Sequence, residues 1–558
     1  MRINFIKSIK IAKKQEVSGW NKALWIVLCF GILGIIFNIL MYTKFAYNSD
    51  FSYATNLALE EMKQMKLYPD GWRYSTGFYV FSINLFCMPF LLFLKNEVLC
   101  RELGMILLCL LMVYVCYKTF YKHSKRTFLS IIILLFIPLT GVVHWYFYDG
   151  NYFNFAFMLM ITMFLAERIL FGYHSKRRLL IYYIVYFLAL LLFTNDGLRN
   201  QLTITIPLFL AVLFFSYKKT KEVLIEKKYL IFLCATFLGS ALGYVIYRVL
   251  LLTTGRVDTD SLNYAFVNST QMVGNFWTYL ANTYSLYGID NAELLSVEGI
   301  QNVLNWFYCT ISTFVIPVIV WKNLYKVENE FIQLIIRFLA ICNGLTIFMV
   351  IATNSSGSRL LLPVYFNNII YMGCFIGFLS HNLYIKYEEI FLICVMVIAV
   401  SNHVTYQVVQ RENNNLHFNG HIMSTLFDPS DSTGLAQFLE EYDLTYGYSD
   451  YFTSLRTASF TKGKVRMVAF NGSDPLDNDV DMISGNWYDV ETHSGKCFIL
   501  VREETVLPDK YYELADEILA FTANFNKSEV TFLNDSINYK ILVFDKNIHL
   551  YNELTMNN

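Results

Sequence analysis

The residues best suited to chemistry are carboxylates, arginines and amides that gather in four short polar segments. These are residues 47–53 with Asp50, residues 144–151 with His144 and Asp149, residues 194–200 with Asn195, Asp196 and Arg199, and residues 354–359 with Arg359. A partly desolvated carboxylate can take a proton from a hydroxyl group near neutral pH, because burial raises its pKa. An arginine presents a planar fork of N–H donors that matches the oxygens of a phosphate. The four segments therefore suit proton transfer beside a bound phosphate.

The chain that positions these segments is otherwise apolar. Of 558 residues, 55% are hydrophobic and only 88 are charged, 44 basic and 44 acidic. A soluble protein of this length would carry roughly 140 charged residues, about a quarter of the chain. A neutral chain lacks the electrostatic footprint of a nucleic-acid binder, and its hydrophobicity excludes a disordered protein. The composition predicts an α-helical polytopic membrane protein.

Apolar runs long enough to cross a bilayer recur between residues 23 and 408. The positive-inside rule assigns the basic stretches between them to the cytoplasm. These are the N-terminus (residues 1–22) and residues 118–126, 168–178, 218–228 and 322–326. The outer loops are then residues 44–99, 144–151, 194–201, 254–299 and 354–359.

Two neighbouring apolar stretches, residues 77–94 and 100–117, cannot both cross if residue 118 is cytoplasmic. Tyr79, Ser82, Asn84 and Pro89 interrupt the first stretch, so we expect it to be re-entrant or to lie on the membrane surface. About 11 spans result, with the N-terminus inside and the C-terminus outside. The first span, residues 23–41, is too long for the apolar part of a cleaved signal peptide, which favours a retained anchor.

Residues 409–558 differ in character and predict an extracytoplasmic α/β domain. Short β-like runs (465–470, 497–501, 539–544) alternate with helical stretches (432–442, 508–521). This region has 11 basic and 23 acidic residues, whereas the rest of the chain has 33 basic and 21 acidic. This uneven distribution of charge supports the predicted orientation of the chain in the membrane, because the excess of basic residues lies mostly in the cytoplasmic turns. Ten of the 11 cysteines precede the domain, so no disulfide framework is predicted.

The order of these parts resembles the GT-C class of glycosyltransferases, in particular the branch of protein O-mannosyltransferases and lipid A aminoarabinose transferases. In that pattern, a first span leads to an outer loop with an acid, a proline-containing surface segment, a non-spanning stretch and later a second acid. Asp50, Pro69 and Asp149 occupy these places. The resemblance covers roughly residues 20–215. The chain departs from several relatives by having Ser49 where they have a first acid and Tyr68 where they have a first proline.

The resemblance implies a membrane glycosyltransferase that moves a sugar from a polyprenyl-phosphate donor to a glycan, lipid or protein acceptor of the cell envelope. Asp50 would be the general base, and Asp149 would orient the acceptor or share the proton. Arg73, Arg199 and Arg359 are the candidates for the donor phosphate, and His144, Asn195, Asp196 and Trp487 for the sugar or acceptor. No cofactor is predicted. Two acids suit a divalent metal, but no Asp-x-Asp pair stands in the first loop, so no metal site is predicted.

Structural explanations compete with each of these assignments. Asp50 suits a helix N-cap and Asp149 a turn, while the arginines suit snorkelling to lipid headgroups. His144 suits an interfacial aromatic belt, and the Tyr and Trp clusters at residues 444–452 and 485–488 suit either a domain core or sugar stacking. Two other functions also stay open, a transporter or flippase for a lipid-linked glycan and a non-catalytic envelope assembly protein. The absence of midplane charges and internal repeats counts against a transporter.

Overall fold

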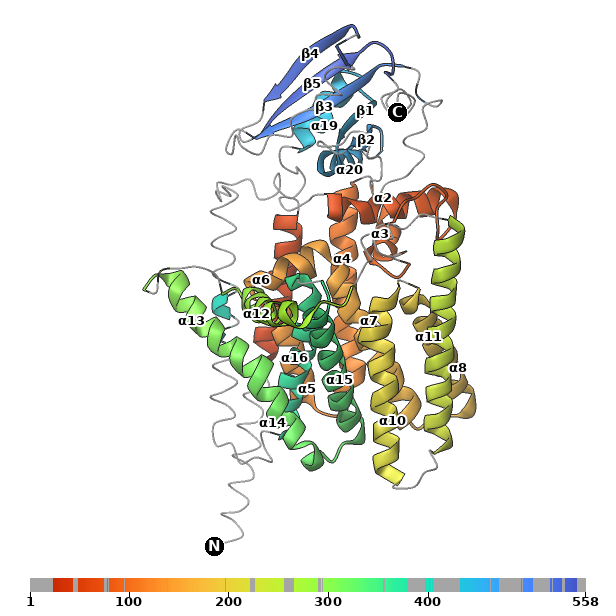
Figure 1. Ribbon diagram of the computed structural model, residues 1–558, viewed down its shortest axis with the longest axis vertical. Coiled ribbons are helices and arrows are strands. Elements are labelled where there is room, and N and C mark those ends of the chain that lie inside the picture. Colours follow the sequence, from red (N-terminus) through yellow and green to blue (C-terminus); the bar gives the residue numbers. More distant parts are fainter. Residues whose placement is uncertain are drawn as a thin grey trace. The chain divides into compact units, whose positions relative to one another are not determined.

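The computed structural model describes residues 24–43, 49–220, 226–254, 265–379, 397–404, 432–470, 493–504 and 522–548. Within these ranges it leaves out residues 75–77, 79, 95, 138, 196, 290–292, 294, 355–356, 399, 403, 462, 494, 524 and 534–536. Most of the described chain is helical, and one small sheet follows near the C-terminus (Figure 1).

Nine helices of the described chain are long and apolar enough to cross a membrane. They are Leu24–Thr43, Glu97–Phe120, Asn151–Phe171, Lys176–Thr194, Leu198–Tyr217, Lys227–Thr253, Glu298–Lys322, Glu330–Ala352 and Ser358–Phe378. A tenth candidate, Lys125–Phe136 with Gly141–Asp149, is bent by 91°. The last predicted span falls largely on residues 380–396, outside the described residues. The chain is a multi-pass membrane protein.

The chain divides into two compact units, each described here by itself. The first contains residues 1–38, 109–246 and 264–416, and the second contains residues 39–108, 247–263 and 417–558. In the first unit, α15 (Glu330–Ala352) packs beside α10 (Ile206–Thr220), α12 (Ser269–Leu286) and α16 (Leu362–Cys374). α16 also packs against α5 (Lys125–Phe136), where a side chain at Gly373 would overlap Ile131. Small residues allow such close helix contacts in a membrane.

Four π-helical segments lie in the described part of the first unit. They are η1 (His144–Asp149), η2 (Gln201–Thr205), η4 (Ile311–Val315) and η7 (Phe375–Leu379). Such segments are rare and often lie at functional sites. The sequence places residues 144–151 in a loop, but the structure continues them as helix up to Gly150, whose φ of 78° ends η1 before α7 (Asn151–Phe171).

Buried amides in the first unit are joined by hydrogen bonds across several helices. Asn343 on α15 donates to Asn368 on α16 at 3.3 Å, and Asn368 donates to Thr313 in η4 at 3.2 Å. Thr313 in turn donates to the Tyr287 hydroxyl at 3.0 Å. Neutral side chains satisfy one another here, because an unpaired polar group is costly within a bilayer.

The second unit contains the C-terminal sheet, whose strand order is β2-β1-β3-β5-β4. The strands are β1 (Tyr446–Asp450), β2 (Arg466–Phe470), β3 (Cys497–Glu504), β4 (Lys527–Leu533) and β5 (Ile537–Phe544). β1 is parallel to β2 and β3, whereas β5 is antiparallel to β3 and β4. Helix α19 (Ser432–Glu441) contributes Leu435 and Leu439 to a core with Phe498 and Ile541. This confirms an α/β domain with a core of its own.

The predicted strands at residues 465–470, 497–501 and 539–544 correspond to β2, β3 and β5. The aromatic run at residues 444–452 contains β1, and its Tyr446 and Tyr448 are 3% and 1% exposed. Tyr446 stacks on the His493 ring at 4.0 Å, and the Tyr448 hydroxyl donates to Asn547 at 2.9 Å. These two tyrosines therefore belong to the domain core. The run at residues 485–488 lies outside the described residues.

Candidate functional site

Asp50 is the second residue of α2 (Ser49–Gln64), a helix of the second unit that is not among the candidate spans. A carboxylate in the first turn of a helix is favoured by the helix dipole and by the unpaired backbone N–H groups. The next residue, Phe51, is fixed from α4 (Glu97–Phe120). Nε of Arg101 donates to the Phe51 carbonyl at 2.9 Å, and the guanidinium lies 4.9 Å from the centre of the Phe51 ring.

Helix α2 is covered from two directions within its unit. Residues 51–58 are all buried. On one side the Tyr53 hydroxyl lies 3.2 Å from Ser82 Oγ, just before α3 (Ile83–Leu91). On another side Asn56 donates to Ser459 Oγ at 3.3 Å, on α20 (Tyr451–Phe460) of the C-terminal domain. Figure 1 shows α2 between α20 and α3. The C-terminal domain therefore helps to hold the helix that carries Asp50.

Glu61 on α2 is a buried acid that the sequence does not predict as a site residue. Glu61 is 4% exposed, and its Oε2 accepts a hydrogen bond from Asn84 Nδ2 at 2.8 Å. Burial raises the pKa of Glu61 to about 7, against a smaller lowering effect of the Asn84 hydrogen bond. Nothing in the local sequence marks Glu61, because only the tertiary packing of α3 buries it.

In the first unit, Asp149 closes η1 and precedes α7. It is 6% exposed, and its Oδ1 accepts a hydrogen bond from Asn151 at 2.9 Å. His144 begins the same segment and packs edge-on against Trp145 with ring centres 5.2 Å apart, as an aromatic-belt residue would. The second acid is thus buried at the N-terminal end of a 21-residue helix.

The structure brings Arg199 to that same end of α7. Its guanidinium lies 4.9 Å from the centre of the Tyr152 ring and 5.7 Å from that of Phe155, both in the first two turns. Nη2 of Arg199 is buried and has no hydrogen-bond partner among the described residues. A buried donor normally has a partner, so this nitrogen is suited to an anionic ligand. The N-terminus of α7 beside this nitrogen adds to the attraction for an anion.

The other predicted site residues lie apart from this arrangement or outside the described residues. Arg359 is exposed in η6 (Ser358–Leu361), which packs against α12 and α15. Asn195 is 2% exposed at the end of α8 (Lys176–Thr194). Arg73 is half-buried between Trp72 and Tyr74 in the second unit. Asp196 and Trp487 lie outside the described residues. Asp50 and Asp149 belong to different compact units.

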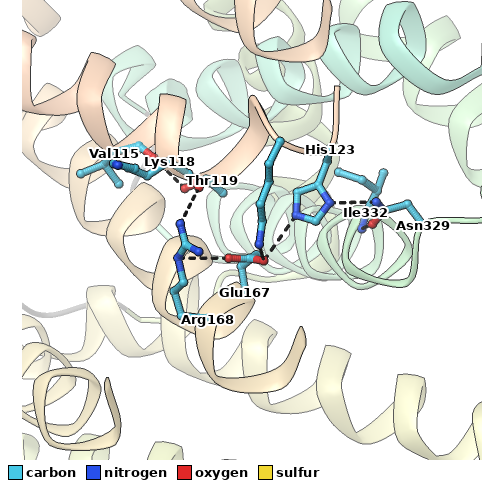
Figure 2. Close-up of polar contacts among 9 residues, drawn as sticks. Val115, Lys118, Thr119, His123, Glu167, Arg168, Asn329 and Ile332 are labelled. Atoms are coloured by element: carbon cyan, nitrogen blue, oxygen red, sulfur yellow. Dashed lines mark hydrogen bonds and ion pairs between the residues drawn. The ribbon is translucent and has the colours of Figure 1, made fainter. Parts of the chain in front are cut away.

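A second charged cluster surrounds Glu167 at the end of α7 that the sequence predicts to be cytoplasmic (Figure 2). Its carboxylate is fully buried, forms an ion pair with Lys122, and lies 3.4 Å from both His123 Nε2 and Arg168 Nε. Arg168 also donates to the Lys118 carbonyl at 3.1 Å. The cluster joins α7 to the end of α4 through one carboxylate and the cations around it.

The same cluster reaches α15 through His123. Asn329 caps α15, because its Oδ1 accepts from the Ile332 N–H at 3.1 Å. Its Nδ2 must therefore face His123 Nδ1, 2.9 Å away, as a donor. His123 is then protonated on Nε2, which faces Glu167. The cluster therefore links Glu167 on α7 to the N-terminal cap of α15 through ion pairs and one hydrogen bond.

Among the described residues, no group of three or more His, Cys, Asp or Glu side chains is placed to hold a metal ion. The functional candidates that sequence reasoning missed are Arg101 and Glu61. Arg101 had a visible signal, because a charged residue near the start of an apolar span is unusual and needs a partner.

Comparison with solved structures places this arrangement in a known fold. The crystal structure of ArnT from Cupriavidus metallidurans bound to undecaprenyl phosphate matches with a TM-score of 0.54. The match covers 93% of this chain and 98% of that chain at 10% sequence identity. The chain has the fold of the GT-C glycosyltransferases. This confirms the predicted GT-C-like fold.

A second GT-C structure, the oligosaccharyltransferase AglB from Archaeoglobus fulgidus in complex with an inhibitory peptide and a dolichol-phosphate, has a TM-score of 0.47. It is 11% identical over 93% of this chain and 74% of its own. No protein-family profile matches the sequence, and no curated protein matches it. The GT-C fold is thus recognised through the structural match to ArnT.

Proposed function

We propose that this GT-C protein transfers a sugar from a polyprenyl-phosphate donor to a cell-envelope acceptor on the extracytoplasmic face of the membrane. The observation that carries the proposal is the full-length structural match to ArnT, which was crystallised with undecaprenyl phosphate. A buried, unpartnered guanidinium nitrogen on Arg199 supports it, because a lipid-linked phosphate would supply the acceptor that this donor lacks.

In the proposed reaction, the Asp50 carboxylate takes the proton of an acceptor hydroxyl. The oxygen then forms a bond to the anomeric carbon of the donor sugar. The bond between that carbon and the phosphate oxygen breaks, and its electron pair leaves with the polyprenyl phosphate. Placement in the first turn of α2 supports Asp50 for this role, because that part of the helix is held from α4 and from the C-terminal domain.

The departing phosphate gains negative charge and needs a cation. Arg199 and the N-terminal end of α7 are the groups we assign to it, because both favour an anion and both lie beside Tyr152. Arg73 and Arg359 remain further candidates for the same phosphate. We assign Asp149 to orientation of the acceptor, together with His144, Asn195, Asp196 and Trp487 as candidate contacts to sugar or acceptor.

The test is incorporation of labelled sugar from synthetic polyprenyl-phosphate donors by membranes with and without the protein. Asp50→Asn should lower transfer about 10²- to 10⁴-fold, the usual contribution of a general base. Protein amount and melting temperature should stay near wild type. Ser49→Ala is the matched control, because it changes the neighbouring position of the same helix turn without removing a carboxylate.

Glycan analysis of a deletion strain separates this function from the alternatives. Loss of one sugar from an envelope glycan, lipid or protein supports a transferase. Accumulation of complete lipid-linked units inside the cell would indicate a flippase instead. Full transfer by Asp50→Asn would remove Asp50 from the mechanism, and unchanged envelope glycans would overturn the proposal.

A further inference from the structure

Glu61 and Asn84 form a buried pair whose hydrogen bonding is incomplete when the acid is ionised. Asn84 is fully buried and donates its Nδ2 to Glu61 Oε2 at 2.8 Å. The other polar atom of the amide, Asn84 Oδ1, is buried and has no hydrogen-bond partner among the described residues. A buried acceptor without a donor costs free energy, so the pair needs one more proton to be satisfied.

Protonation of Glu61 supplies that proton. A neutral carboxylic acid both accepts and donates, and an amide does the same, so the two groups can form a ring with two hydrogen bonds. The ionised acid can only accept, which leaves Asn84 Oδ1 unsatisfied and places a charge in a buried site. The same conclusion follows from the burial of Glu61, which raises its pKa to about 7.

The charged groups around this pair do not compensate an ionised Glu61. On α2 itself, Glu60 lies 3.8 Å from Lys63, and neither forms an ion pair with Glu61. α3 carries no charged residue and a single thiol, Cys87. The charged residues on the other elements packed against α2 are Arg456 on α20, Glu97, Arg101 and Glu102 in the first turns of α4, and Lys66, Asp70 and Arg73 after α2. In the described structure, none of them forms an ion pair with Glu61.

We propose that Glu61 is a positioning residue that holds α2 against α3 as a neutral acid, so that ionisation of this one side chain loosens the helix that carries Asp50. Glu61 lies 11 residues after Asp50, about three helical turns along the same helix. The link to catalysis rests on the proposed function of Asp50. The hydrogen-bonded pair of neutral Glu61 and Asn84, here called the latch between α2 and α3, does not depend on that function.

The first test is the melting temperature of the purified full-length protein between pH 5 and 9. Because the pKa of Glu61 is raised in the folded state, its contribution to stability is complete below about pH 4.5 and is lost as the pH rises through about 7. The melting temperature of the wild type should therefore fall between pH 5 and 8. The melting temperature of Glu61→Gln should fall clearly less, because an amide keeps the neutral hydrogen-bonded ring and has no proton to release.

Glu60→Gln is the matched control, because Glu60 is the neighbouring acid on the same helix and accepts a hydrogen bond from Gln64 instead of Asn84. It should follow the wild-type pH dependence. If the melting temperatures of Glu61→Gln and the wild type fall equally over this range, the latch is overturned.

If Glu61→Gln does not fold, Asn84→Asp serves instead. It places a second carboxyl beside Glu61, and the fall in melting temperature with pH should become larger than in the wild type. An equal or smaller fall would overturn the latch.

The second test is the pH profile of sugar transfer. The alkaline limb of the wild-type profile should move to higher pH in Glu61→Gln and stay in place in Glu60→Gln. A purely structural role would lower activity at every pH without moving the limb. If no sugar is transferred by any variant, the proposed function fails while the melting experiment still decides the latch. If transfer occurs and the limb does not move, the link between Glu61 and Asp50 is overturned.

Discussion

Arg101 on α4 donates a hydrogen bond from Nε to the carbonyl of Phe51 on α2, at 2.9 Å, while its guanidinium covers the Phe51 ring. The side chain is 1% exposed, so the interaction is shielded from water. It fixes the residue that directly follows Asp50. A single side chain near the start of one span thus sets the first turn of the helix to which we assign the general base.

Replacement of Arg101 should therefore impair transfer more than it impairs folding. A hydrogen bond from a charged donor contributes about 1.5–3 kcal/mol, so Arg101→Met should lower transfer about 10- to 100-fold. Arg101→Lys should be intermediate, because it keeps the charge without the guanidinium Nε. Labelled-sugar transfer at saturating donor measures the effect. Lys63→Gln, on the exposed end of α2, is the control and should transfer at the wild-type rate.

Arg199 should act on the donor phosphate. Arg199→Gln removes the unpartnered buried donor, so the KM for the lipid-linked donor should rise about 10-fold or more, with little change in the KM for the acceptor. Arg199→Lys should recover part of the loss, because a point charge lacks the fork of donors. Arg177→Gln, an exposed arginine on α8, is the control. An unchanged KM for the donor in Arg199→Gln would contradict this assignment.

Glu167 should stabilise the folded protein without taking part in sugar transfer. Its carboxylate is the acid that Lys122, His123 and Arg168 share (Figure 2). Removing one partner of a buried ion pair costs about 3–5 kcal/mol, and less where a partner is exposed, as Lys122 is. Glu167→Gln should lower the melting temperature by several degrees. Exposed Glu328→Gln is the control, and equal melting of the two variants would show that the cluster is not stabilising.

The sequence by itself determined the class of protein. Long apolar runs must become helices inside a bilayer, because only a helix satisfies its own backbone there. The α/β domain predicted for residues 409–558 could also be recognised from the sequence, since the runs that form β2, β3 and β5 carry apolar β-forming residues. The order of acids and spans pointed to a GT-C fold, and the structural match to ArnT confirmed that fold. All of this depends on patterns that are local along the chain.

Only the tertiary structure decided which side chains meet. Residues 144–151 look like a loop because they contain the turn pair Asp149-Gly150, yet residues 144–149 form η1. Arg199 lies over Tyr152 although 47 positions separate them in the sequence. Glu61 becomes a buried acid only because α3 brings Asn84 to it. Burial and hydrogen-bond satisfaction depend on neighbours distant in the chain, and residue type and local spacing do not specify those neighbours.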